Sequence, residues 1–158
     1  MGLRLLATAV VVLAVAAPVA VGDEVTRDSY KAEVEPICRA NTKANERILR
    51  GVRPEVRRGK LVLAGRRFLR AAAALRQALR QIRAVPQPPA DQAKLGRWLG
   101  YVKQEARLFR TGGKALKAGN KTKAQTVVVK LTHTANLANS QVLSFGFRYC
   151  KLNPAKFT

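Results

Sequence analysis

The chain contains two cysteines, Cys38 and Cys150, and their separation constrains its fold more than any other feature. They lie 112 positions apart (150 − 38), so a bond between them would bring the two ends of the chain together. The pair lacks the C-x-x-C spacing of a redox-active site and has no neighbouring histidine that would lower a thiol pKa. We therefore expect a structural disulfide, provided that the protein reaches an oxidising compartment.

Residues 1–22 have the pattern of a secretory signal peptide. One arginine precedes a long apolar run, and small residues lie just before the acidic Asp23. The apolar run, residues 5–21, contains a proline and is short for a membrane span, which needs about 20 apolar residues. We therefore expect cleavage before Asp23, in preference to an uncleaved membrane anchor, and one domain over residues 23–158 with no transmembrane helix. The protein is then secreted or held in the cell envelope, where a Cys38–Cys150 disulfide would form and stabilise the fold by about 4 to 5 kcal/mol.

Apolar residues recur at intervals of three and four in four segments of the mature chain, residues 30–48, 61–85, 95–116 and 124–149. This periodicity is typical of amphipathic helices that share one core. Glycines and prolines interrupt the pattern between the segments, and the connections are short, which favours antiparallel neighbours. The sequence therefore predicts an all-α, four-helix up-down-up-down bundle. In that arrangement Cys38, near the start of the first helix, meets Cys150, near the end of the fourth.

Two local signals are ambiguous. Pro36 falls inside the first segment, so either Asp28 caps a kinked helix or the main helix begins at Pro36. The run "TVVVKLTHT" in the fourth segment is rich in β-branched residues and would suit a strand. Its apolar positions continue the helical pattern, so we expect a helix there.

The formal net charge is +21, and its distribution indicates a cationic surface. No acidic residue occurs between Glu55 and Asp91, so the second helix lacks the acids that usually alternate with basic residues on a solvated face. At 100° per residue, one face of that helix lies opposite its apolar stripe and carries five arginines: Arg66, Arg70, Arg76, Arg80 and Arg83. We expect this face to contact an anionic polymer or membrane surface, an extracellular nucleic acid or an acidic protein; the alternative is a merely solvated face. The sequence contains no signature of sequence-specific nucleic-acid recognition.

A second group of polar residues lies on the first and fourth helices: Asn41, Asn45, Asn136 and Asn139. Antiparallel pairing of the two helices from the disulfide would place Asn45 opposite the region of Leu143. One interpretation is a hydrogen-bonded layer that fixes the register of the helices. The other is a polar site that carries a small ligand.

The inventory of reactive side chains favours a non-enzymatic protein. His133 is the only histidine, and it lies about 200° from Leu131 on the apolar stripe, so we expect it to face solvent. No cluster has the spacing of a metal site or a catalytic triad, and we expect no cofactor. Trp98 flanks the stripe of the third helix and belongs either to the edge of the core or to a surface that binds or inhibits another protein.

Three stretches, "YKAEVEPICRANTKAN", "KLTHTANLAN" and "SFGFRYC", together resemble a group of uncharacterised small secreted proteins of actinobacterial type. The resemblance rests on an early I-C-x-A-N segment and a terminal F-G-F-x-x-C segment, and it covers nearly the whole mature chain. It implies an exported, helical, disulfide-closed protein and transfers no catalytic residue. The sequence thus predicts non-enzymatic binding of an anionic partner in the cell envelope or outside the cell.

Overall fold

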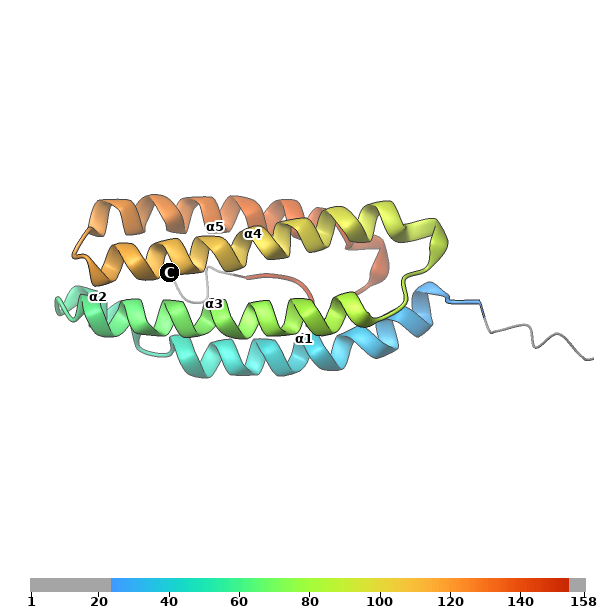
Figure 1. Cartoon of the computed structure of the whole chain (residues 1–158), viewed down its shortest axis with the longest axis horizontal. Helices are drawn as coiled ribbons and strands as arrows, with labels where there is room; N and C mark the ends of the chain where they lie inside the picture. The colour runs from blue at the N-terminus through green and yellow to red at the C-terminus, as the bar shows by residue number, and fades with distance from the viewer. Residues whose placement is uncertain (1–23, 154–158) are drawn as a thin grey trace, which may run out of the picture.

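The computed structural model of the chain describes residues 24–153 and is helical over most of that length (Figure 1). The predicted signal peptide, residues 1–22, and its cleavage point before Asp23 lie outside the described residues. The elements are, in order, α1 (Arg27–Leu49), α2 (Val52–Arg57), α3 (Leu61–Ala84), η1 (Pro89–Asp91), α4 (Gln92–Lys117), α5 (Lys121–Gln141) and η2 (Leu143–Phe145). No strand occurs within the described part, so the all-α prediction is confirmed.

The four long helices α1, α3, α4 and α5 form a bundle around one apolar core (Figure 1). Helix α3 packs against α4, α4 packs against α5, and α1 packs against α3. The core consists largely of the predicted stripes; Phe68, Leu75 and Leu131, for example, are buried. The run "TVVVKLTHT" lies inside α5, so the helical periodicity prevails over the β-branched composition. Among the described helices, none combines the length and the apolar character that a membrane span requires.

Helix α1 is continuous through Pro36, which resolves the ambiguity at its start. Thr26 is the N-cap, and its hydroxyl accepts a hydrogen bond from the backbone N–H of Ser29 at 3.1 Å, while the Ser29 hydroxyl accepts one from the Thr26 backbone N–H at 3.0 Å. This reciprocal capping box satisfies backbone donors that the helix leaves free. Asp28 lies in the first turn and is not the cap, contrary to one of the expected arrangements.

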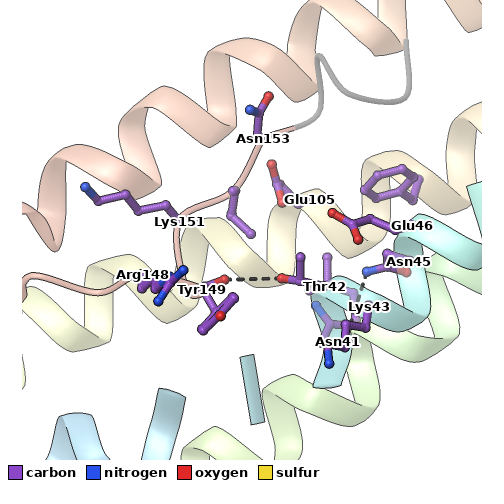
Figure 2. Close-up of a pocket in the computed structure, with 13 residues that line it drawn as sticks. Asn41, Thr42, Lys43, Asn45, Glu46, Glu105, Arg148, Tyr149, Lys151 and Asn153 are labelled. Atoms are coloured by element: carbon purple, nitrogen blue, oxygen red, sulfur yellow. Dashed lines mark hydrogen bonds between the residues drawn. The ribbon is translucent and has the colours of Figure 1, made fainter. Parts of the chain in front are cut away.

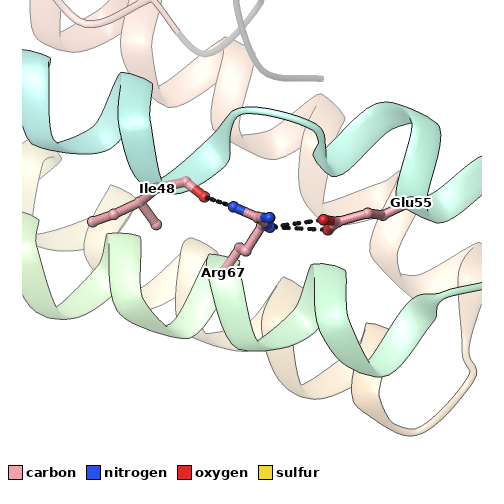
Figure 3. A network of polar contacts seen from close by, with 3 residues as sticks. All are labelled: Ile48, Glu55 and Arg67. Carbon is pink, nitrogen blue, oxygen red and sulfur yellow. Dashed lines mark hydrogen bonds and ion pairs between the residues drawn. The ribbon is translucent and has the colours of Figure 1, made fainter.

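The glycine-rich connection after α1 contains a short helix, α2, that the sequence pattern did not predict. A three-way contact explains its position (Figure 3). The Arg67 guanidinium of α3 donates to both carboxylate oxygens of Glu55 in α2, at 2.9 and 3.0 Å, and to the carbonyl oxygen of Ile48 in α1, at 3.1 Å. One side chain therefore fixes α1, α2 and α3 relative to one another.

Helices α3 and α4 approach closely at Gly65 and Gly113. A Cβ atom placed on Gly65 would lie 2.6 Å from the carbonyl oxygen of Gly113, and one placed on Gly113 would lie 2.8 Å from the carbonyl oxygen of Gly65. Real Cβ atoms essentially never approach another atom so closely. The crossing therefore needs the absence of a side chain at both positions.

The end of the chain differs from the prediction. Helix α5 begins at its Asn120 cap, whose side chain accepts from the Lys123 backbone N–H at 2.8 Å, and it ends at Gln141 instead of continuing to residue 149. Residues 142–153, here called the return segment, then run back between α1 and α5 (Figure 1). Gly146 makes the turn with a positive φ of 58°, a conformation that favours glycine.

The predicted disulfide between Cys38 and Cys150 is present, with the two Cα atoms 5.0 Å apart. Cys38, however, lies in the middle of α1, and Cys150 lies in the return segment beyond α5. The bond therefore joins a helix to an irregular segment and does not join two helix ends. The expected juxtaposition of Asn45 and Leu143 is wrong. Residues 143–145 lie beside the start of α1, where the Phe145 ring contacts Tyr30 with ring centroids 6.5 Å apart, far along the helix from Asn45.

Candidate functional site

The return segment is fixed to α1 by contacts on both sides of the disulfide. The Glu35 carboxylate accepts hydrogen bonds from the backbone N–H groups of Arg148 and Tyr149. The Thr42 hydroxyl donates to the carbonyl oxygen of Tyr149 at 3.3 Å. These contacts supply hydrogen-bond partners for backbone groups that no helix or sheet satisfies. An irregular segment can therefore form one wall of the bundle.

The predicted asparagine layer takes a different form. Asn139 of α5 bonds the backbone of Leu152 twice, through its amide donor and its amide oxygen, at 2.8 Å each. Asn45 donates instead to the Asn41 side chain, one turn away in α1, at 3.1 Å. Asn136 is exposed. The four asparagines therefore form no single layer, because the return segment lies between the helices that carry them.

A cleft of about 410 Å³ opens between α1, α4 and the return segment (Figure 2). Its floor is apolar and includes Leu75, Phe109 and Leu152. Its polar lining combines one acid from α4 with side chains of α1 and of the return segment: Asn41, Thr42, Lys43, Asn45, Glu46, Glu105, Arg148, Tyr149, Lys151 and Asn153. Its size falls within the usual range of small-molecule sites, roughly 300 to 1,000 Å³. Two of the predicted asparagines thus belong to a cavity, although not to the expected one.

Glu105 is the residue of this cleft that sequence reasoning missed. It is only 2% exposed, and its Oε1 atom is buried without a hydrogen-bond partner. Burial raises the pKa of its carboxyl to about 8. The signal was present in the sequence, because Glu105 follows Val102 by three positions and precedes Phe109 by four, which places it on the buried face of α4.

The five arginines of the predicted cationic face are all exposed on α3. We call Arg66, Arg70, Arg76, Arg80 and Arg83 the arginine face. None of them forms a hydrogen bond or an ion pair with another described residue. Several acids are instead engaged inside the fold: Asp91 with Arg27, Glu55 with Arg67, and Glu35 with the return segment.

A second cationic row, on α4, was not recognised in the sequence. Its members are exposed and recur at intervals of three and four: Lys103, Arg107, Arg110, Lys114 and Lys117. This spacing, read directly from the chain, places them on one side of the helix. The α4 cationic row therefore offers an internal comparison for the arginine face, with the same number of charges.

The exposure of His133 and Trp98 decides between the interpretations that the sequence left for them. His133 is exposed, as predicted. Trp98 is 1% exposed and stacks on Phe147 of the return segment with ring centroids 5.6 Å apart, so the alternative of a protein-binding edge at Trp98 is wrong. Within residues 24–153, no three His, Cys, Asp or Glu side chains gather in a group that could hold a metal ion. Comparison with protein-family models, curated proteins and solved structures finds no match.

Proposed function

We propose that this protein is an exported, non-enzymatic, four-helix bundle that binds an anionic partner in the cell envelope or outside the cell through the arginine face of α3. The observation that carries this proposal is the row of exposed arginines without acidic partners. A solvated surface normally mixes both signs of charge, whereas the charged groups of this face are guanidinium groups alone. Guanidinium groups bind phosphate and carboxylate oxygens through paired hydrogen bonds.

The dimensions of the arginine face suit an extended polyanion. Arg66 and Arg83 are 17 residues apart, so the face runs for about 25 Å along the helix at about 1.5 Å per residue. The acids that would neutralise it are used elsewhere, because Asp91 and Glu55 are held in ion pairs within the fold. The partner class is therefore a phosphate-rich or carboxylate-rich polymer or headgroup surface.

The other parts of the proposal have their own support. Export is supported by the Cys38–Cys150 disulfide, since such bonds persist in oxidising compartments. The up-down-up-down order is supported by contacts at one end of the bundle, where Arg27 pairs with Asp91 at 2.7 Å and Arg97 bonds Gln141 at 2.9 Å. Membership among small secreted proteins of actinobacterial type rests on the two sequence segments described above.

The test compares three forms of the purified chain 23–158: the wild type, a variant with the arginine face changed to Gln, and a variant with the α4 cationic row changed to Gln. Both variants lose five positive charges, so they differ in position and not in net charge. Binding is measured over a salt gradient to acidic phospholipid vesicles, to a glycerol-phosphate polymer and to duplex DNA. Circular dichroism confirms that each variant remains helical.

We expect the wild type to release as salt rises, because each cationic contact displaces a counterion. On duplex DNA, five contacts give a slope of log K against log salt of about −4.5. On whichever of the three anions the wild type binds most tightly, the arginine-face variant should lose most of the affinity, while the α4-row variant should retain it. Equal weakening of the two variants would mean that net charge alone attracts anions, and it would refute the arginine face as a site.

A further inference from the structure

The cleft between α1, α4 and the return segment contains two buried oxygen atoms that lack donors. Glu105 Oε1 and Asn45 Oδ1 are both buried without a hydrogen-bond partner, and both residues line the cavity (Figure 2). A buried acceptor without a donor destabilises the fold, so a protein that keeps two of them in one cavity gains stability when a ligand supplies donors there. The missing component is therefore a hydrogen-bond donor.

We propose that this cleft binds a small zwitterion of the amino-acid class, whose ammonium group donates to Glu105 and Asn45. An ammonium group carries three donors and a positive charge, which matches a buried carboxyl beside an amide oxygen. The inference is independent of the arginine face, which lies on the solvent side of α3.

The rest of the cleft fits the other parts of such a ligand. Lys43, Arg148 and Lys151 are exposed residues of its lining and supply positive charge for a carboxylate at the mouth. Leu75 and Phe109 supply an apolar surface for a side chain. A purely cationic ligand would meet the repulsion of these bases, whereas a zwitterion satisfies both ends of the cavity.

The protonation state of Glu105 gives the proposal a second readout. The titratable or charged groups that line the cleft with it are Lys43 and Glu46 on α1 and Arg148, Tyr149 and Lys151 on the return segment. With a pKa of about 8, the Glu105 carboxyl is about nine-tenths protonated at pH 7. An ammonium group beside it favours the carboxylate form, so binding at pH 7 should release about one proton per ligand.

The experiment is isothermal titration calorimetry of the oxidised chain 23–158 with L-leucine and L-phenylalanine. N-acetyl-L-leucine lacks the ammonium group, and L-leucinamide lacks the carboxylate. We expect at least one free amino acid to bind, the acetylated compound to bind at least tenfold more weakly, and the amide to show an intermediate affinity. Titration in two buffers of different ionisation enthalpy measures the released proton.

Three variants complete the test. Glu105→Gln keeps the size of the side chain and should weaken binding at least tenfold and abolish proton release. Asn45→Leu removes the second acceptor and should also weaken binding. Glu33→Gln removes the same charge from an exposed position outside the cleft and should change neither affinity nor proton release. Thermal unfolding identifies any variant that does not fold.

Several outcomes would overturn the proposal. No binding of either amino acid up to about 10 mM would do so, as would equal binding of N-acetyl-L-leucine and L-leucine. An unchanged affinity in folded Glu105→Gln would also refute it, and so would binding without proton release. Because the arginine face plays no part in these titrations, such a failure leaves the polyanion proposal to its own test.

Discussion

The glycine contact between α3 and α4 makes a quantitative prediction. Gly113→Ala places a Cβ 2.8 Å from the carbonyl oxygen of Gly65 and 2.9 Å from Cγ of Leu69, whereas ordinary contacts begin at 3.4 Å. The two helices must therefore separate locally by about 0.6 Å, since a backbone oxygen cannot rotate away. Overpacking of this kind costs about 1 to 3 kcal/mol.

The same substitution also has a favourable effect, because alanine is about 1 kcal/mol better than glycine inside a helix. Gly100→Ala isolates that effect, since Gly100 lies in the same helix and a Cβ there would have no neighbour within 4 Å. We expect Gly100→Ala to raise the free energy of unfolding by up to about 1 kcal/mol. The free energy of unfolding of Gly113→Ala should be lower than that of Gly100→Ala by the overpacking cost, about 1 to 3 kcal/mol.

The assay is urea unfolding of the oxidised protein, monitored by circular dichroism. The two variants are compared when their free energies of unfolding have the same slope against urea concentration. In the difference between their free energies of unfolding, the gain in helix propensity common to both substitutions cancels, and the packing cost remains. If Gly113→Ala is as stable as Gly100→Ala, the helices do not approach as described and the reasoning is refuted.

Three further predictions concern charge and covalent structure. The pKa of Glu105 is raised from 4.5 to about 8, so between these values the folded state holds a proton that the unfolded state has lost, and the free energy of unfolding falls by up to about 5 kcal/mol as pH rises through this range. Urea unfolding measured at several pH values should show this fall in the wild type and a flatter dependence in Glu105→Gln. An unchanged pH dependence in the variant would assign the effect to other groups. Arg27 holds the pKa of Asp91 below its usual value, so the pair stabilises the fold at neutral pH, and that stability is lost as pH falls through the lowered pKa. Asp91→Asn should lower the melting temperature at pH 7, and it should reduce the difference between the melting temperatures at pH 7 and pH 3. Replacing Cys38 and Cys150 by Ser should lower the free energy of unfolding by about 4 to 5 kcal/mol, and oxidised wild type that titrates with free thiols would contradict the bond.

Periodicity predicted the helical core well because one physical rule dominates it. Phe68 and Leu75 recur at helical spacing, and burial against neighbouring helices selects the same spacing. The same rule failed after Gln141, where Phe145 and Tyr149 continue the pattern although the helix has ended. There the disulfide, the hydrogen bonds of Asn139 and the turn at Gly146 determine the path. The first two are contacts between residues distant in the sequence and the third is a backbone conformation, and the periodicity of apolar residues encodes none of them.

The candidate sites were predicted unevenly for a related reason. The arginine face depends on helical geometry and charge alone, and both are local properties of α3. The cleft depends on the return segment, which completes its wall. Glu105 could be placed on the buried face of α4 from its spacing, but its lack of a partner follows from the packing of three elements. Sequence reasoning therefore located the surface, but of the cavity it identified only Asn41 and Asn45 and not the wall or Glu105.

The return segment has a consequence for how the bundle assembles. Its Phe147 ring covers Trp98, and its Cys150 lies against α1, so the buried faces of α1 and α4 are completed by residues made after all four long helices. During synthesis from the N-terminus, these apolar faces stay open until residues 142–153 have followed. The contacts that close the α1 face span more than a hundred positions. Such long-range closure is slow compared with helix formation. A truncation before residue 142 would therefore leave helices with an unsealed core, prone to aggregation, and oxidation of Cys38 with Cys150 reports that closure has occurred.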